Sequence, residues 1–514
     1  MRRWIATVAA GLFILIAVPS LRAEEELRLS LAEALRIGLE NNLDLVVERK
    51  NPAIAGNDVI SQESAFDPGL AANATAGGSK SEPENRFVAP GRAKSYGANV
   101  SWTDRLQFGS SYAVGFGTAR REGAGLFYDP SYNSGVSLNW TMPLLKGFGT
   151  EVNTADIVIA REGLEISKSQ LSDRAQRTIK EIEDAYWDVL AARAGLDVAR
   201  ESLKLAQDLL DLNTKKVEVG TLAPIEITQA EAGVASREEG VIVAETAVWN
   251  AEDNLRRLLA IPPQDPRWNL TIVPTDAPRF DVQAVDLQAS IASALERRAE
   301  LDAARRQVST RSLAERVARA NLKHELNLVA DMNPAGNNLK EIIPTPGDDG
   351  ILGTDDDGAD FVTEGWSSSV SEIPKLNNYD WSVELQYKFP IGNRAAKAAA
   401  ANATLEREKA EASLLNAEQT VRVDVRTAVR NVESGAKRVK AAEASTILQR
   451  KTLDAEQKKF DNGMSTSFEV LRIQTDLSNA RVAEIRAKLD YMKSLADLER
   501  AQGTLLEARG LKLE

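Results

Sequence analysis

The segment Ile182–Gly220, IEDAYWDVLAARAGLDVARESLKLAQDLLDLNTKKVEVG, decides the fold because apolar residues recur in it every seven positions. These residues are Ile182, Val189, Leu196, Leu203, Leu210 and Val217, and alanines follow three positions after the first four. After Gly220 the same spacing resumes with Ile227, Val234, Val241, Val248 and Leu255. A seven-residue repeat with a narrow apolar seam predicts helices packed as left-handed coiled coils. The first helix, with roughly 60 residues from Asn153 to Val217, is expected to be about 90 Å long.

The chain contains this pattern twice. A shift of 243 residues places Leu171–Ala260 on Leu414–Gly503 without a gap, and Gly220 then meets Gly463. The duplication extends to the strands before each hairpin and to the first helix of each half. Because proline ends helices, the proline-rich segment between the copies is expected to be a joint. The predicted division is into repeats at about 24–261 and 279–514, a joint at 262–278, and helical hairpins at about 152–260 and 394–507.

The amino terminus has the layout of a secretory signal peptide. Arg2 and Arg3 precede an apolar run from Ile5 to Val18, and cleavage is expected after Ala23. The run is short for a membrane span, so we expect residues 1–23 to be removed on export. Removal changes the formal net charge from −12 to −15, because three arginines and no acids are lost. Such an acidic exported chain is not expected to bind nucleic acid.

The composition excludes most catalytic chemistry. There are no cysteines and one histidine, His324. Disulfides, a cysteine-linked lipid anchor, thiol catalysis and histidine-rich metal sites are therefore not expected. The sequence also lacks the glycine motifs of nucleotide-binding proteins. We expect no enzyme activity and no cofactor.

No apolar run of 18 or more residues follows the signal peptide, so a mature chain that crosses a membrane must do so as closed β-structure. Candidate strands lie at about 66–142 and 322–390, where apolar or aromatic residues alternate with polar or small ones. Such alternation suits strands between lipid and water, although a soluble half-buried sheet gives the same pattern. The signal peptide, and the position of the strands between long helices, favour the membrane.

The loop 333–378 carries an acidic run and is expected to lie outside the cell, because long connections of membrane barrels are extracellular. The aspartates that could bind calcium are Asp348, Asp349, Asp355, Asp357 and Asp360. Carboxylates interspersed with glycine are typical of calcium loops, but the spacing does not fit an EF-hand. A solvated loop without an ion is the alternative reading.

Taken in order, these features resemble those of the TolC-like outer-membrane efflux protein family. The resemblance covers essentially the whole mature chain and includes the internal duplication and two strand-proline-helix junctions. It also rests on the motif Ser30–Leu35, on Glu40-Asn41-Asn42 and on Asn51-Pro52. The two turns that end the long helices complete it: Val219, Gly220, Thr221 and Leu222 in the first repeat, and Asn462, Gly463, Met464 and Ser465 in the second.

The resemblance implies a mainly α fold with a β-barrel portion. Duplicated coiled-coil hairpins would form a trimeric periplasmic α-barrel joined to a transmembrane antiparallel β-barrel. The homotrimer would lie in the outer membrane of a Gram-negative-type bacterium, as the passive exit duct of a tripartite efflux pump or a type I secretion system. The implied partners are a periplasmic adaptor protein, an inner-membrane transporter, which selects the cargo, and outer-membrane lipid.

The number of barrel strands is a departure from the family. Tyr96–Phe116 reads as an additional hairpin turning near Asp104-Arg105, with no such hairpin expected in the second half. We expect four strands per chain in the barrel wall rather than six, on the ground that twelve helices fit twelve strands better.

The resemblance also implies a gate at the two turns, which would contact the adaptor as well. The gate residues are Glu226, Phe460, Ser465, Glu469 and Arg472. Three Glu469 side chains around a trimer axis would form a negative ring that favours cations. Arg472, three residues further along the helix, can pair with Glu469 and neutralise that ring.

Phe460 and Ser465 lack the hydroxyl and the positive charge that tie the family's closed gate to the position of Glu226. Alternatively, Glu226 and Glu469 are only solvated acids near the positive ends of helices.

Two other classes of protein stay open on the sequence alone. A periplasmic adaptor also has a coiled-coil hairpin, but it is expected to carry one hairpin flanked by compact β-domains. A non-channel coiled-coil structural protein would not need the alternating strands. Dependence on detergent separates a channel from both.

Overall fold

The computed structural model describes residues 26–81, 91–123, 126–278, 280–348, 350–355 and 357–512. The expected signal peptide and Asp349 lie outside these ranges. The chain divides into two compact units, each built from both repeats. The hairpin unit comprises Met1–Val47, Arg174–Ala294 and Arg422–Glu514, and the sheet unit comprises Glu48–Asp173 and Leu295–Val421.

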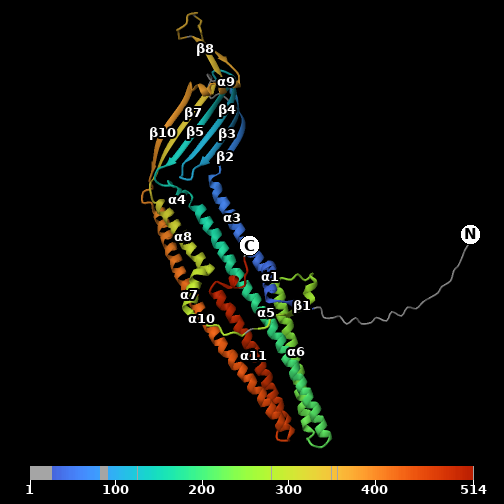
Figure 1. Cartoon of the computed structure of the whole chain (residues 1–514). Coiled ribbons are helices and arrows are strands. Elements are labelled where there is room, and N and C mark those ends of the chain that lie inside the picture. The colour runs from blue at the N-terminus through green and yellow to red at the C-terminus, as the bar shows by residue number, and fades with distance from the viewer. Residues whose placement is uncertain are drawn as a thin grey trace, which may run out of the picture. The chain divides into compact units, whose positions relative to one another are not determined.

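A six-stranded antiparallel sheet forms much of the sheet unit (Figure 1). Its strands are β2 (Gly69–Ser81), β3 (Gly91–Arg105), β4 (Ser111–Gly123), β5 (Ser131–Pro143), β7 (Glu325–Asn337) and β10 (Asn378–Lys388). The order across the sheet is β10-β7-β5-β4-β3-β2, so that β10 and β2 are its edges. Beyond β7, the separate hairpin of β8 (Leu339–Thr345) and β9 (Gly358–Thr363) is followed by α9 (Trp366–Ser371) and η3 (Ile373–Lys375).

The expectation of four strands per chain is wrong. Strands β3 and β4 pair along their whole length and lie in the same sheet as the other four. The physical reason is width: packed helices are about 8–10 Å apart and paired strands about 4.8 Å apart, so equal numbers do not give equal widths. The second half also contains a hairpin, contrary to expectation, but β8 and β9 form a sheet of their own.

Four of the six strands connect to helices at one end of the sheet. Helix α3 (Lys50–Glu63) and η1 (Ser64–Phe66) lead into β2, and β5 leads through α4 (Thr150–Asn153) into α5 (Ala155–Glu218). Helix α8 (Ala299–Ala320) leads into β7, and β10 leads into α10 (Arg394–Asp461). The β3–β4 turn lies at this same end, because Arg105 donates a 2.8 Å hydrogen bond to the Asn153 side chain.

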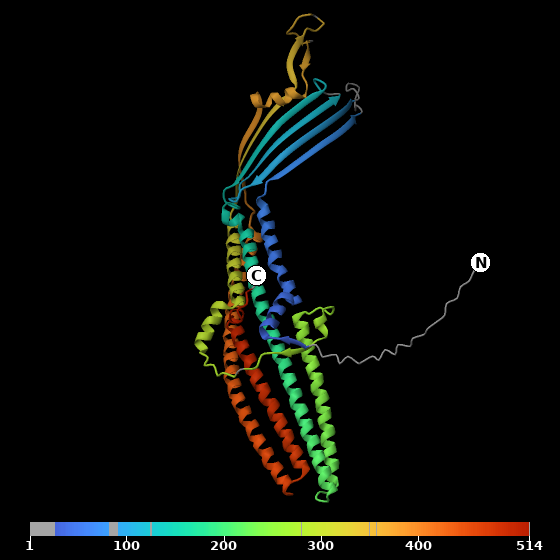
Figure 2. The same cartoon turned by 45° about the vertical axis from the view of Figure 1, so that its right-hand side comes forward.

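Two pairs of long helices dominate the hairpin unit (Figure 2). Helix α5 pairs with α6 (Ile225–Leu259), and α10 pairs with α11 (Ser467–Ala501). The predicted seam of α5 is fully buried at Ile182, Ala185 and Val189, whereas its later leucines, Leu196, Leu203 and Leu210, are half-buried. The prediction of a mainly helical chain with duplicated long hairpins and an antiparallel β-portion is confirmed.

Shorter elements complete the hairpin unit, and the sequence patterns did not indicate all of them. They are α1 (Leu31–Asn41), α2 (Leu43–Glu48), η2 (Pro266–Asn269), α7 (Leu287–Arg297), α12 (Leu505–Ala508) and a parallel pair of strands, β1 (Glu26–Leu29) and β6 (Thr271–Pro274). Ser30 and Glu33 form a capping box at the start of α1. None of the helices within the described ranges is long and apolar enough to cross a membrane.

Candidate functional site

The two turns that join the long helices have the same backbone geometry. At the end of α5, Thr221 N–H donates to Lys216 O at 2.8 Å, and Gly220 N–H donates to Val217 O at 2.9 Å. At the end of α10, Met464 N–H donates to Lys459 O at 2.8 Å, and the N–H of Gly463 donates to the preceding turn at 3.1 Å. Both glycines have positive φ, 78° and 72°. These are Schellman caps, in which glycine adopts a left-handed conformation without steric cost.

Glu226 joins the two hairpins. It lies in the first turn of α6, and its carboxylate accepts a 3.1 Å hydrogen bond from the backbone N–H of Ser467 in the first turn of α11. An acid at a helix N-terminus satisfies a free N–H and interacts well with the helix dipole. The carboxylate of one hairpin therefore caps a helix of the other.

Asn213 reinforces this junction from α5. Its side-chain amide donates to Ser467 Oγ at 2.7 Å and to Glu226 O at 3.2 Å, and both Asn213 and Ser467 are fully buried. Sequence reasoning missed Asn213, although a signal was present. It occupies the position of the coiled-coil seam held by Ala206 one heptad earlier, and a polar residue in such a seam fixes helix register.

Phe460 is the apolar centre of the same junction. It is 4% exposed and packs with Leu209 of α5, and Lys216 Nζ lies 4.3 Å from the centre of its ring. Lys216 also forms a 3.5 Å ion pair with Asp461. The other members of this buried cluster are Leu453, Val470, Ile473 and Leu477. Phe460 thus holds the helices together by burial and a cation–π contact, without the hydroxyl of a tyrosine.

Arg237 is a further contact between the hairpins that sequence reasoning missed. From α6 its guanidinium donates to Leu471 O of α11 at 3.3 Å and to the Thr475 hydroxyl. Burial lowers the pKa of this guanidinium from its ordinary value. Gly233 lies one turn earlier, and a Cβ there would come within 2.9 Å of the Leu471 side chain. The missing Cβ lets α6 approach α11 closely.

The remaining predicted gate residues interact within their own hairpin. Arg472 donates to one Glu469 oxygen at 2.6 and 3.0 Å, and the ion pair is exposed. This hydrogen bond with Glu469 raises the pKa of Arg472. Ser465 donates to Glu456, which lowers the pKa of that carboxyl. The structure therefore brings Glu226 and Phe460 into one junction and places Glu469, Arg472 and Ser465 beside it on the second hairpin.

Apolar side chains are exposed at both turns. Val219 is 73% exposed and Met464 is 77% exposed, and Ile225 and Phe468 in the adjoining first helical turns are also largely exposed. Leu222, in contrast, packs against the buried cluster around Phe460. Exposed clusters of apolar side chains are typical of a surface that contacts a partner.

The six-stranded sheet has one apolar face and one polar face. A continuous row of paired residues on the apolar face runs through Leu70, Trp102, Val114, Leu138, Met332 and Trp381. The neighbouring row, on the other face, contains Thr103, Asn139, Asp331 and Ser382. Asn139 donates to Asp331 at 2.6 Å. Most side chains of the apolar row are well exposed, so this face is available for lipid.

One of the predicted calcium ligands, Asp357, forms hydrogen bonds within the acidic loop itself. The Asp357 carboxylate accepts hydrogen bonds from the backbone N–H groups of Gly353, Gly347 and Thr354, which lower its pKa. Among the residues that the structure describes, no group of three His, Cys, Asp or Glu is placed to hold a metal ion. Asp349 lies outside these residues, so calcium binding by this loop stays a prediction.

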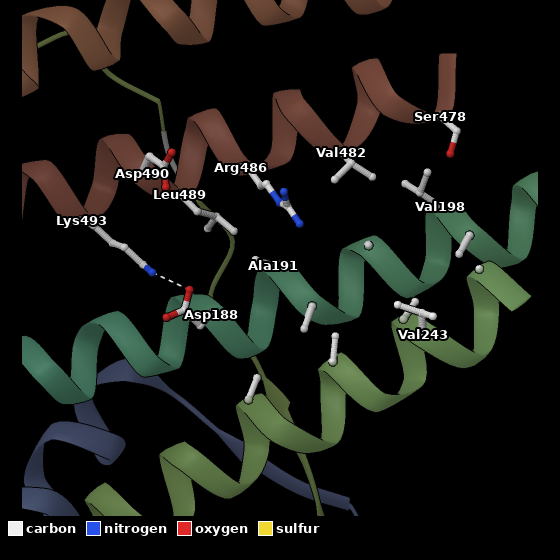
Figure 3. A pocket seen from close by; sticks show the side chains of 17 residues that line it. Asp188, Ala191, Val198, Val243, Ser478, Val482, Arg486, Leu489, Asp490 and Lys493 are labelled. Atoms are coloured by element: carbon white, nitrogen blue, oxygen red, sulfur yellow. Dashed lines mark hydrogen bonds and ion pairs between the residues drawn. The ribbon is translucent and has the colours of Figure 1, made fainter. Parts of the chain in front are cut away.

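A cavity of about 590 Å³ lies between α5, α6 and α11 (Figure 3). Alanine and glycine form much of its lining, for example Ala191, Gly195 and Gly240. The ion pair between Lys493 and Asp188, 2.5 Å, lies at its edge. The cavity exists because these small side chains leave the space between the three helices unfilled.

Known proteins match this chain across both the sheet and the hairpins. The profile of a family described as outer membrane efflux protein matches residues 35–260 and 290–504. Among solved structures, the chain is similar to the Campylobacter jejuni CmeC outer membrane channel, with a TM-score of 0.65, 16% identity, and coverage of 92% of this chain and 86% of that one. It is also similar to VceC of Vibrio cholerae, with a TM-score of 0.62, 15% identity, and coverage of 92% of this chain and 96% of that one. The open state of MtrE of Neisseria gonorrhoeae gives a TM-score of 0.61, 18% identity, and coverage of 92% of this chain and 89% of that one. No curated protein matches the chain.

Proposed function

Because the chain belongs to the outer membrane efflux protein family, we propose that three copies form the passive exit duct of a tripartite efflux pump or a type I secretion system. The six-stranded sheet lies in the outer membrane of a Gram-negative-type bacterium, and the long helices lie in the periplasm. The duct conducts its cargo without chemistry, so it needs no cofactor.

The observation that carries this proposal is the two-faced sheet. Its apolar face exposes aromatic and aliphatic side chains from every strand except β7, whose apolar side chains are half-buried, while its other face carries amides, hydroxyls and carboxylates. A soluble protein that exposed so large an apolar face would aggregate, whereas lipid covers it without cost. The polar face then lines the water-filled duct. The two edge strands, β2 and β10, require pairing partners because a free strand edge is not tolerated in lipid.

The turns of the hairpins are the proposed gate and adaptor surface. Val219, Met464 and Phe468 offer the adaptor exposed apolar contacts at both turns. The junction of Glu226, Asn213 and Ser467, together with Arg237, ties the two hairpins of one chain. Opening would separate the hairpins and break these hydrogen bonds. We therefore assign the junction to the closed state.

The test is the mass of the purified protein in detergent, together with its distribution between membrane and soluble fractions. We expect a trimer that is extracted from the outer membrane only with detergent. A chain that stays monodisperse without detergent would favour an adaptor or a structural coiled coil and would overturn the proposal. A monomer or dimer in detergent would overturn the trimer.

A further inference from the structure

The two edges of the sheet are suited to each other. Each strand is antiparallel to its neighbour and the number of strands is even, so β2 and β10 run in opposite directions. An edge strand β10 placed beside β2 of a second copy therefore continues the antiparallel pattern. With 13 residues in β2 and 11 in β10, the two edges have matching lengths.

The register of the sheet gives its strands the tilt that a closed barrel requires. The apolar row begins at Leu70, one residue from the helix-connected end of β2, and finishes at Trp381, seven residues from the helix-connected end of β10. Across the five steps from β2 to β10, the row therefore moves six residues further from the helix-connected ends of the strands. This displacement is the stagger of the sheet. With about 3.3 Å per residue and about 4.8 Å per step, the strands tilt by about 40°. Closed barrels require a tilt of about 35–45°.

The width of six tilted strands also matches the helices of the same unit. Six strands at this tilt span about 38 Å, whereas four would span about 25 Å. The sheet unit contains four long helical segments: α3, α8, and parts of α5 and α10. Four packed helices span about 32–40 Å. Strands β3 and β4 thus supply the width that a four-stranded sheet would lack.

The side chains of the two edges complement each other in size. On the apolar face, β2 carries Ala72, Ala74 and Ala76, and β10 carries Trp381, Val383, Leu385 and Tyr387. Large side chains on one strand pack well beside small ones on the next. All residues of β10 are exposed in the single chain, so this edge is open to a partner.

We propose that β2 of each copy pairs with β10 of the next, so that three chains close a barrel of eighteen strands. This inference rests on the proposed trimeric duct. Because side chains on one face must stay on that face, the stagger per chain is even, and Ala74 lies opposite Val383 or Leu385. Such a barrel is about 36 Å across between opposite backbones, which leaves an aqueous channel along its polar face.

The first test is cross-linking in a chain that has no cysteine of its own. In outer membranes, oxidation of the Ala74→Cys/Val383→Cys or the Ala74→Cys/Leu385→Cys variant is expected to yield covalent trimers. The matched control is Ala74→Cys/Glu384→Cys, because Glu384 lies between the two target positions but faces the other side of the sheet. Cross-linking of the control to the same extent, or of neither test pair, would overturn the edge pairing.

The second test is a count of strands in a single-particle electron microscopy reconstruction of the full-length protein in detergent. Eighteen strands in the wall of a trimer would support the inference. A trimer with twelve strands would overturn the inference but leave the proposed duct intact. The absence of a trimer would instead overturn the proposed function itself.

Discussion

Tyr186 shows how a single buried side chain holds several elements of the hairpin unit. From α5 its hydroxyl donates to the Asp276 carboxylate at 2.7 Å, and it accepts hydrogen bonds from the N–H groups of Thr275 and Asp276 at 3.2 Å. Burial, together with the hydrogen bond to Asp276, raises the pKa of this hydroxyl to about 12. The same carboxylate accepts from the N–H of Leu31 at 2.7 Å, so the first helix depends on it as well.

This pKa predicts a specific dependence of stability on pH. A phenol has an ordinary pKa of about 10, and a raised value in the folded protein means that folding favours the protonated form. The resulting stability is present below pH 10 and is lost as the pH rises towards about 12. We expect the difference in denaturation midpoint between wild type and Tyr186→Phe to be constant below pH 10 and to shrink above it. A difference that does not change up to pH 12 would contradict the assignment.

Arg509 illustrates the cost of a buried charge. It pairs with Glu183 at 2.9 Å and with Glu499 at 2.8 Å, and the Glu183 side chain is only 1% exposed. Removal of the partner of a buried ion typically costs about 3–5 kcal/mol, because the remaining charge has lost its compensation. Arg509→Met is therefore expected to destabilise the hairpin unit by about that amount in denaturant titrations. Addition of Glu183→Gln is expected to restore part of the loss, and no recovery would show that packing rather than charge is responsible.

The junction of the two hairpins predicts how the proposed gate behaves. An N-cap hydrogen bond stabilises a helix start by about 0.5–2 kcal/mol, and Glu226 supplies one to α11 from the other hairpin. If the junction belongs to the closed state, Glu226→Ala weakens that state by about this amount per chain. We expect a higher open probability in planar-bilayer recordings.

The matched control for this variant is Glu231→Ala, which removes an exposed carboxylate further along α6. Arg237→Ala tests the second contact between the hairpins and is expected to act in the same direction as Glu226→Ala. Equal open probabilities for wild type, Glu226→Ala and Arg237→Ala would exclude the junction from gating.

The sequence predicted the helical hairpins well but the junction between them poorly, and the reason is physical. Heptads and glycine caps are local patterns, so the coiled coil and the two turns can be recognised from spacing alone. The hydrogen bond from Ser467 to Glu226 joins residues 241 positions apart, and no local pattern encodes it. Asn213 was recognisable as a polar residue in an apolar seam, but its partner was not.

The pairing of the strands was not predicted correctly from the sequence. The alternation in β3 and β4 identified both strands and their hairpin, but alternation does not say whether a hairpin joins the main sheet or, like β8–β9, stands apart. The register shows that the β3–β4 hairpin joins the main sheet, because Trp102 and Val114 continue the apolar row between Leu70 and Leu138. The relative widths of packed helices and paired strands favour six strands over four on physical grounds alone.

The ion selectivity of the channel depends on the proposed assembly of three chains. Three Glu469 side chains around the axis would attract cations, but each is held by Arg472 in an exposed ion pair at 2.6 Å. An exposed pair contributes little to stability, yet it cancels the charge that a permeating ion meets. We expect Glu469→Gln to lower cation selectivity in planar-bilayer reversal potentials, because the arginine charge is then unopposed. Arg472→Ala is expected to raise it, because the carboxylate is then free. If neither variant shifts the reversal potential, these side chains do not line the constriction.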